Sequence, residues 1–511
     1  MKKIVSFGEA PLTLEDIWDV ALRRREPELS RADAVRNRIV HSARIVERTI
    51  REGGTIYGVT TGYGDSCETE VPAELINDLP IHLTRYHRCG TGRFLTDEET
   101  RAVMAARLGS LVLGWSGVSL ELVQLLADIL RADILPRIPA EGSVGASGDL
   151  TPLAYVAASL AGEGTVSVAG EIMEARDALA KAGLKPVTLR PKEALAIMNG
   201  TAVMTGLAVL AYKRAEWLSR LACRLTAMTS LSLLGNAAHF DARLAEAKPH
   251  PGQMRATARI RADLAHYAAS CEPDRIQDRY SVRCAPHVIG VLEDLLPTFR
   301  SLIETEINSA NDNPLFDPAD GRTLHGGHFY GGHVAFAMDG LKTLVANVAD
   351  LLDRQMALLV DTRYNNGLPQ NLSGARGPRA AINHGLKAVQ IAASAWTAEA
   401  LKLTMPASVF SRSTECHNQD KVSMGTIAAR DALRVLELSE QVAAANLIAT
   451  AQALELRKRD SFAPGAHIDA FLAEIGEIVP FLDEDVPLDG VLLELTDAIR
   501  MRGFSLPEDA A

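Results

Sequence analysis

The stretch from Thr201 to Leu234, TAVMTGLAVLAYKRAEWLSRLACRLTAMTSLSLL, decides the fold class of this 511-residue chain. Its apolar residues recur at intervals of three and four, so they cover one wide face of a helix. A run of this length with such a face is typical of a long helix in a bundle and not of a crossover helix between parallel strands.

The same periodicity returns along the second half of the chain, at 286–308, 332–359, 379–405 and 422–456. An aromatic content of only 5% also favours helices over sheets. A few short β pieces are expected near Ile4 and at 166–172. We therefore predict a mainly α fold built around a long-helix bundle.

Two domains are predicted. Residues 1–205 alternate helical stretches with Gly-rich irregular ones and form a loop-rich N-terminal domain that carries the active-site loops. Residues 206–511 form the central and C-terminal long-helix bundle. Helices this long have apolar faces too wide to be covered within one chain, so we expect the chain to self-associate.

Charge and hydropathy exclude several classes of partner. With 53 Lys+Arg and 64 Asp+Glu the net charge is −11, which argues against a nucleic-acid partner. No apolar run reaches the roughly 18 residues of a membrane span, and the N-terminus reaches Gly8 before a signal-peptide core can form. The six cysteines include no C-x-x-C pair. A cytoplasmic protein without a membrane partner is predicted.

The segment from Gly142 to Tyr155, GSVGASGDLTPLAY, is the least ordinary in the chain, and three interpretations compete for it. A phosphate-binding loop would need a Gly-Lys-Ser/Thr ending, which is missing. A serine nucleophile elbow would need G-x-S-x-G, but Gly148 directly follows Ser147. The third interpretation is a backbone cyclisation at Ala146-Ser147-Gly148.

In that cyclisation the amide nitrogen of Gly148 attacks the carbonyl carbon of Ala146, and two water molecules leave. The product is a five-membered ring, 4-methylidene-imidazol-5-one. Gly148 serves as nucleophile because it has no β-carbon to block the approach, Ser147 loses its hydroxyl, and Ala146 is small. The surrounding structure would have to compress the loop, because such strain persists only where the fold enforces it.

At this point the sequence resembles the family of histidine, phenylalanine and tyrosine ammonia-lyases and the related aminomutases. Besides Ala146-Ser147-Gly148, the segments that carry the resemblance are Tyr57–Gly64 (YGVTTGYG), Met198–Thr201 (MNGT), Gln277–Arg283 (QDRYSVR), Asn308–Pro314 (NSANDNP), Gly327–Gly331 (GHFYG) and His417–Gly425 (HNQDKVSMG). The resemblance implies an α-helical homotetramer with active sites shared between subunits, a small amino acid as substrate, and no external cofactor. The related fumarase-like lyases would need a Gly-Ser-x-x-Met-Pro-x-Lys-x-Asn loop, which the sequence lacks.

The motifs also depart from the family pattern at single positions. Thr60 stands where Asn is frequent, Tyr63 where Phe is usual, and Asn311 where Thr is usual. His328 and Tyr330 replace residues of a usual Gly-Asn-Phe-His-Gly. None of these departures removes a residue to which the resemblance gives a central role.

The resemblance assigns the roles of the remaining candidates. Tyr57 would be the base that removes the β-proton; because a free tyrosine has a pKa of about 10, we expect a nearby cation or hydrogen-bond donors to favour its phenolate. Arg283 would bind the substrate carboxylate bidentately. The neutral groups that support the ring carbonyl, the carboxylate and the tyrosine network would be Asn199, Gln277, Tyr280 and Asn313.

Four positions bear on the substrate side chain. Gln419 stands where histidine enzymes have Glu, and Tyr86 and His87 fall at the two selectivity positions; Phe329 is also placed at the substrate by the resemblance. Because Tyr86 and His87 can both hydrogen-bond a phenol, L-tyrosine, with L-phenylalanine as a further substrate, is the first expectation. Histidine, giving urocanate, a 2,3-aminomutase reaction and an inactive helical oligomer stay open as alternatives.

A metal site is a further possibility at His325, His328 and His333. The glycines between them give no helical i, i+4 presentation, and no carboxylate or thiol completes a ligand spacing. We therefore expect no metal.

Overall fold

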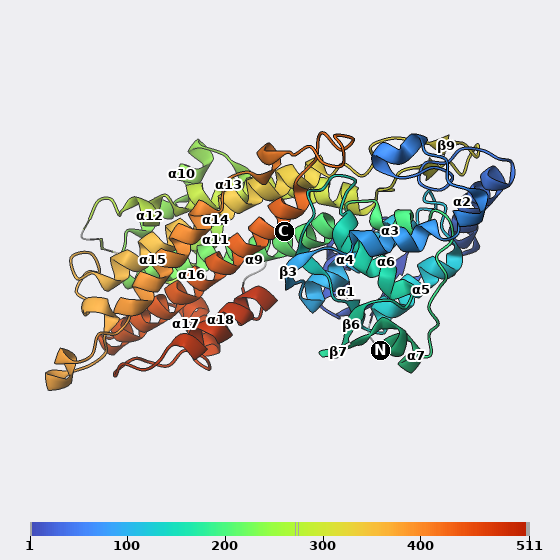
Figure 1. The fold of residues 1–511 in the computed structure, drawn as a ribbon. Helices are drawn as coiled ribbons and strands as arrows, with labels where there is room; N and C mark the ends of the chain where they lie inside the picture. The colour runs from blue at the N-terminus through green and yellow to red at the C-terminus, as the bar shows by residue number, and fades with distance from the viewer. Residues whose placement is uncertain (1–2, 271, 274, 507–511) are drawn as a thin grey trace. The chain divides into compact units, whose positions relative to one another are not determined.

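The structure is a computed structural model that describes residues 3–270, 272–273 and 275–506, so Cys271 lies outside it. The chain forms two compact units (Figure 1). Unit 1 consists of Met1–Ala211, Arg300–Asp339 and Pro406–Arg430, and unit 2 of Tyr212–Phe299, Gly340–Met405 and Asp431–Ala511. Because each unit is made of three separate stretches, this grouping does not test the predicted division at residue 205, which stays a prediction.

Unit 1 combines short helices with small sheets. Its helices are α1 (Leu14–Ala21), α2 (Asp33–Arg51), α3 (Leu79–His87), α4 (Asp97–Leu111), α5 (Leu120–Arg131), α6 (Leu150–Leu160), α7 (Ala175–Lys181) and α8 (Glu193–Met198). Its strands are β1 (Lys3–Phe7), β2 (Arg25–Leu29), β3 (Thr91–Phe94), β4 (Ile134–Pro136), β5 (Pro139–Glu141), β6 (Thr165–Val168), β7 (Glu171–Glu174), β8 (Leu315–Phe316) and β9 (Thr323–Leu324). β1 and β2 pair in parallel, whereas β3–β5, β4–β6–β7 and β8–β9 are antiparallel.

Helix α4 shows how the sequence fixes these elements. Thr96 caps it: the Thr96 hydroxyl accepts a hydrogen bond from the Glu99 backbone N–H at 3.3 Å, and the Glu99 carboxylate accepts one from the Thr96 N–H at 2.9 Å. From Glu99 to Leu111 every residue of the helix is buried. It is therefore an internal support around which the rest of unit 1 packs.

The ends of three helices, α3, α6 and α8, lie close together in unit 1. Helix α6 packs against α8 and α3, and α3 also packs against α8. Helix α3 ends at His87, α6 begins at Leu150 directly after the Gly148-Asp149 pair, and α8 ends one residue before Asn199. Segments more than 100 residues apart in the sequence therefore meet at one place in unit 1.

Unit 2 is helical. Helices α10 (Ala242–Ala247), α11 (Pro251–Ala268), α12 (Tyr280–Arg283), α15 (Lys387–Lys402), α17 (Ala466–Ile475) and α18 (Asp489–Met501) lie within it. The unit boundaries fall inside α9 (Ala202–Ser232), α13 (Ala285–Ile307), α14 (Gly332–Val360) and α16 (Gly425–Arg459). Figure 1 shows the long helices of unit 2 as a bundle.

Buried polar contacts tie the bundle together. The Arg224 guanidinium on α9 lies 2.7 Å from the Asp263 carboxylate on α11, and both side chains are buried. The Asn446 side chain on α16 donates to the Leu352 carbonyl on α14 at 2.9 Å. Buried polar groups of this kind must be paired, so they fix which helices lie together.

The predicted mainly α, long-helix fold is confirmed. The runs predicted at 201–234, 286–308, 332–359 and 422–456 correspond to α9, α13, α14 and α16, and the predicted β pieces to β1, β6 and β7. The run at 379–405 was predicted too long, because α15 begins only at Lys387: Gly385 has a φ of +52°, outside the helical region. Within the described residues no helix is long and apolar enough to cross a membrane.

Candidate active site

The Ala146-Ser147-Gly148 segment lies between β5 and α6, and its backbone conformation requires glycine at the third position. Gly148 has a φ of +70° and pairs with Gly200 in an isolated bridge. A Cβ at residue 148 would overlap the carbonyl oxygen of Gly200, which accepts the Asp149 N–H at 2.8 Å. The fold therefore compresses this segment against a second backbone.

The N-terminal flank of the segment is fixed by residues far away in the sequence. The Ser423 hydroxyl donates to the Gly145 carbonyl at 3.1 Å, and the Met424 N–H donates to the Val144 carbonyl at 3.0 Å. Such contacts hold the backbone in place directly before Ala146.

Asp149 anchors the C-terminal end of the Ala146-Ser147-Gly148 segment. It is fully buried and accepts hydrogen bonds from the Met204 N–H at 2.9 Å, from the Ser143 hydroxyl at 3.1 Å and from the Thr426 hydroxyl. Burial raises the pKa of the Asp149 carboxyl to about 6, although these donors act in the opposite direction. The starts of α9 and α16 are thereby joined to the Ala146-Ser147-Gly148 segment.

A cavity of about 480 Å³ opens beside this segment, entirely within unit 1. It is lined by Tyr57, Tyr63, Gly64, Cys67, Leu83, Tyr86, His87, Ala146, Ser147, Leu150, Leu195, Asn199, Asn313, His325, Gly326, Phe329, Glu415, Asn418, Gln419, Asp420 and Lys421. Nine of the residues predicted from the sequence are among them: Tyr57, Tyr86, His87, Ala146, Ser147, Asn199, Asn313, Phe329 and Gln419. Gly148 follows Ser147 directly in the sequence.

Tyr57 is held by the backbone of its own motif. Its hydroxyl oxygen accepts the Gly64 N–H at 2.7 Å. The pKa of Tyr57 is nevertheless raised, first by burial and then by the Glu415 carboxylate and the Cys67 thiol, while the Gly64 hydrogen bond lowers it. The net direction is opposite to the one expected for a base that must ionise.

Asn199 and Asn313 contact one another. The Asn199 side-chain nitrogen donates to the Asn313 carbonyl at 2.8 Å, and the Asn313 side-chain oxygen accepts the Gly326 N–H at 2.8 Å. The side-chain oxygen of Asn199 is buried and has no hydrogen-bond partner among the described residues. It is an acceptor that a donor on a bound substrate can satisfy.

Tyr86 and His87 form a ring pair at the end of α3. Their ring centroids are 4.3 Å apart with an interplanar angle of 36°. The Nδ1 atom of His87 lies 3.1 Å from the Leu83 carbonyl, and burial lowers the pKa of the His87 imidazole. Burial raises the pKa of Tyr86, so both rings are uncharged hydrogen-bonding groups at neutral pH.

Gln419 reaches the segment from the loop before α16. Its side-chain nitrogen lies 3.3 Å from the Ser147 hydroxyl oxygen, and its side-chain oxygen accepts the Thr414 hydroxyl at 2.9 Å. Between Thr414 and Gln419 the three residues Glu415, Cys416 and His417 have φ values of +51°, +52° and +67°. Three successive non-glycine residues in the left-handed region are strained, and such strain is concentrated at functional sites.

Glu415 is a pocket residue that sequence reasoning missed. Its carboxylate accepts the Asp65 N–H at 3.0 and 3.1 Å, which links the 414–419 loop to the Tyr57–Gly64 motif. The segment identified from the sequence begins two residues later, at His417. Glu415 lines the cavity at the start of the left-handed turn, for which the sequence carries no local signal.

Two further pocket residues are Tyr63, which departs from the family pattern, and His325, which the sequence offers as a metal ligand. His325 lines the cavity with Asn313 and Phe329. Among the described residues there is no group of three His, Cys, Asp or Glu side chains placed to hold a metal ion.

Gln277, Tyr280 and Arg283 lie in unit 2, and none of them is among the described residues that line the cavity. Tyr280 is 73% exposed, and the Arg283 guanidinium lies 4.6 Å from the centroid of its ring. The Arg283 Nε donates to the Asp278 carbonyl at 2.9 Å. These three side chains therefore belong to unit 2, whereas Ser147 belongs to unit 1.

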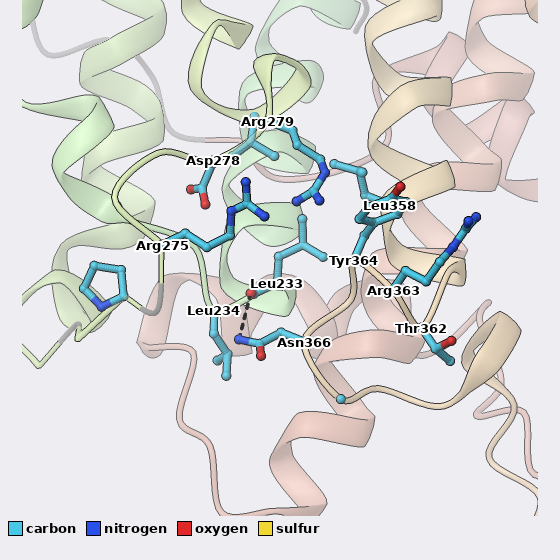
Figure 2. Close-up of a pocket in the computed structure, with 13 residues that line it drawn as sticks. Leu233, Leu234, Arg275, Asp278, Arg279, Leu358, Thr362, Arg363, Tyr364 and Asn366 are labelled. Atoms are coloured by element: carbon cyan, nitrogen blue, oxygen red, sulfur yellow. Dashed lines mark hydrogen bonds between the residues drawn. The ribbon is translucent and has the colours of Figure 1, made fainter.

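The same segment borders a second cavity of about 360 Å³, shown in Figure 2. Asp278, Arg279 and Val282 line it together with Arg275 and Tyr364. Figure 2 shows the guanidinium groups of Arg275 and Arg279 directed toward the same region. The Arg279 guanidinium stacks on the Tyr364 ring at 4.1 Å, which orders this loop next to Arg283.

Comparisons with known proteins agree on one family. Residues 12–477 match the family described as aromatic amino acid lyase. A histidine ammonia-lyase of Caldanaerobacter subterraneus subsp. tengcongensis is 37% identical over 487 residues, covering 95% of this chain and 94% of that protein. One of Sorangium cellulosum is 38% identical over 491 residues, covering 94% of each. The solved structure of a tyrosine aminomutase from Streptomyces globisporus superposes with a TM-score of 0.89 at 33% identity, covering 98% of this chain and 97% of that one.

Proposed function

Since this chain belongs to the aromatic amino acid lyase family, we propose that it is an ammonia-lyase that converts L-histidine to urocanate and ammonia. The resemblance inferred from the sequence is thereby confirmed, and the protein is a carbon–nitrogen lyase. The observation that carries the choice of substrate is the likeness to histidine ammonia-lyases across about 95% of the chain. It favours histidine over tyrosine, which was the first expectation.

The chemistry of the cavity is compatible with an imidazole side chain. A neutral imidazole has one donor nitrogen and one acceptor nitrogen. The Gln419 amide and the uncharged rings of Tyr86 and His87 offer both partners, and Glu415 adds a carboxylate acceptor. A site that satisfies both ring nitrogens discriminates against side chains that lack them.

The residues at the Ala146-Ser147-Gly148 segment fit the proposed prosthetic group. Gly148 lies in contact with the Gly200 backbone, the segment is fixed at both ends, and Ser147 faces the cavity. When formed from these residues without an external cofactor, 4-methylidene-imidazol-5-one supplies an electrophilic carbon that helps the amine to leave.

The other side chains bind the substrate and move its proton. Tyr57, as the phenolate, removes the β-proton of the substrate. The unpaired side-chain oxygen of Asn199 accepts a hydrogen bond from the substrate amine.

A homotetramer with shared active sites completes this proposal. The cavity brings Tyr57, Ser147 and Asn199 together, while the proposed carboxylate clamp Arg283 lies on unit 2 and does not line it. Arg283 of one subunit would then act on the substrate bound at Ser147 of another, together with Gln277 and Tyr280. A guanidinium from outside the cavity supplies the charge that a substrate carboxylate needs.

L-tyrosine is the second candidate substrate. Gln419 is a neutral amide, and Tyr86 with His87 can hydrogen-bond a phenol as well as an imidazole. The likeness to a tyrosine aminomutase adds a third outcome, in which ammonia returns to the β-carbon.

One incubation separates these outcomes. Purified protein is given equal concentrations of L-histidine, L-tyrosine and L-phenylalanine, and products are identified by chromatography, ultraviolet spectrum and mass. Urocanate as the main product is expected. Mainly p-coumarate would assign the enzyme to tyrosine, β-amino acids would make it an aminomutase, and the absence of any product would contradict the proposed function.

A further inference from the structure

A buried ion pair lies behind the cavity, and no step of the proposed mechanism uses it. The Lys192 ammonium is 2.6 Å from the Asp312 carboxylate, and both side chains are completely inaccessible to solvent. Lys192 has a φ of +82°, a conformation that a lysine rarely adopts. Strained backbone conformations are concentrated at functional sites, so the strain at this buried lysine suggests a function for its charge.

The pair connects directly to the two asparagines of the cavity. The second oxygen of Asp312 accepts the Asn313 N–H at 2.7 Å. The Asn313 carbonyl in turn accepts the side-chain nitrogen of Asn199 at 2.8 Å. A chain of hydrogen bonds therefore runs from Lys192 through Asp312 and Asn313 to Asn199.

A second buried cation fixes the backbone of the same segments. Arg107, which is fully buried, donates to the Asn311 carbonyl at 2.8 Å and to the Asn199 carbonyl at 3.1 Å. It also donates to the Ala196 carbonyl at the end of α8. Arg107 thus holds the 311–313 segment and the end of α8 together.

This chain of contacts determines which end of the Asn199 amide stays without a hydrogen-bond partner. Because the nitrogen donates to Asn313, the oxygen is the end left without a partner. A shift of the Asn313 carbonyl would release the nitrogen and let the amide turn, which would present a donor where the substrate amine needs an acceptor.

We propose that the Lys192–Asp312 pair is a positioning device that fixes the Asn313 carbonyl and thereby keeps the side-chain oxygen of Asn199 directed at the substrate amine. The inference rests on the proposed function, since that function gives Asn199 its contact with the substrate. Stability alone is a weak reason for the pair, because replacing both charges of a buried pair by apolar residues is often neutral or stabilising.

Two double variants test the proposal. Lys192→Met/Asp312→Leu removes both charges and the acceptor for the Asn313 N–H, and kcat should fall about 100-fold, the size of effect that a misplacement of roughly 1 Å produces. Lys192→Gln/Asp312→Asn keeps a neutral hydrogen-bonded pair and should retain kcat within a few-fold. If the first variant does not fold, Lys192→Met/Asp312→Asn takes its place and should show an intermediate loss.

The matched control is a second buried pair, formed by Arg224 and Asp263 in unit 2. Arg224→Met/Asp263→Leu should leave kcat unchanged even if it lowers the melting temperature. Intact mass is measured for every variant, because a mass two waters below the sequence shows that Ala146-Ser147-Gly148 has cyclised. If Lys192→Met/Asp312→Leu lacked this mass deficit, the ion pair would be needed for cyclisation, and its proposed role in turnover would be overturned.

A double-mutant cycle with Asn199→Ala gives the decisive readout. If the ion pair acts through Asn199, its removal in the Asn199→Ala background should change kcat less than threefold. A further 100-fold loss there would overturn the proposal.

A crystal structure of Lys192→Met/Asp312→Leu gives a readout that needs no substrate. The Asn199–Asn313 contact should be broken in it, and an unchanged contact would overturn the proposal. Absence of turnover by the wild-type enzyme would contradict the proposed function and leave this structural readout valid.

Discussion

The side-chain nitrogen of Gln419 lies 3.3 Å from the hydroxyl oxygen of Ser147, although 272 residues separate them in the sequence. The residue that the motif comparison relates to the substrate ring therefore also touches the serine from which the electrophile would form. Substrate choice and the reacting centre share one side chain, so changes at Gln419 should alter preference and rate together.

Replacing Gln419 by Glu should increase the preference for histidine. A carboxylate accepts the imidazole N–H and attracts an imidazolium, whereas it has no such partner on a phenyl ring. We expect the ratio of kcat/KM for L-histidine to that for L-tyrosine to rise about tenfold. The ratio is measured by competition, with Asn418→Asp as the neighbouring control. An unchanged ratio would remove Gln419 from substrate selection.

Replacing Ser147 by Ala should abolish turnover and leave the fold intact. Alanine has no hydroxyl to lose, so the second dehydration cannot take place. Intact mass should then show no deficit of two waters, while circular dichroism and the melting temperature should match those of the wild type. Turnover above a thousandth of the wild-type rate would be incompatible with the assignment of the electrophile.

The pH profile should report the ionisation of Tyr57. Its pKa is raised, so below that pKa the phenolate fraction, and with it kcat, should grow about tenfold per pH unit. Glu415→Gln removes a negative charge that raises this pKa, and the rise should move about one unit toward lower pH. The expected sign is thus higher relative activity of the variant near neutral pH.

The control for this experiment is Tyr57→Phe. This variant should bind substrate, but it should lose nearly all turnover, and its kcat should no longer increase with pH. A shift toward higher pH in Glu415→Gln, or a rise that survives in Tyr57→Phe, would show that another group is being titrated.

Mixed oligomers should test whether sites are shared between subunits. Ser147→Ala and Arg283→Ala should each be nearly inactive alone. Co-expressed, they should regain part of the activity, because some sites would combine an intact Ser147 from one chain with an intact Arg283 from another. Size-exclusion chromatography with light scattering should show four chains in each preparation. No recovery in mixed tetramers would place both residues of a working site in one chain.

Local patterns predicted much of this structure. The apolar spacing of 201–234 is a property of one helix and needs no distant contact, so α9 was found within a few residues at each end. The Ala146-Ser147-Gly148 segment was found because its chemistry depends on three adjacent residues. Tyr86 and Gln419 were found by their spacing from fixed motifs.

Features that depend on distant segments were not predictable in the same way. The raised pKa of Tyr57 arises partly from Glu415, more than 350 residues away in the sequence. Glu415 itself lines the cavity at the start of the left-handed turn at 415–417. The Lys192–Asp312 pair likewise joins two segments that no periodicity relates.

The close approach of Gly148 to the Gly200 carbonyl has a consequence for reading mutational data. Any side chain at 148 would both block the cyclisation and collide with a second backbone, so inactive variants there combine two defects in one phenotype. The side chain of Ser147 lies in the cavity beside the Gln419 side-chain nitrogen, so a substitution there meets no second backbone. In a saturation scan of this chain, position 147 will therefore measure the requirement for the reaction, and position 148 the joint requirement for reaction and folding.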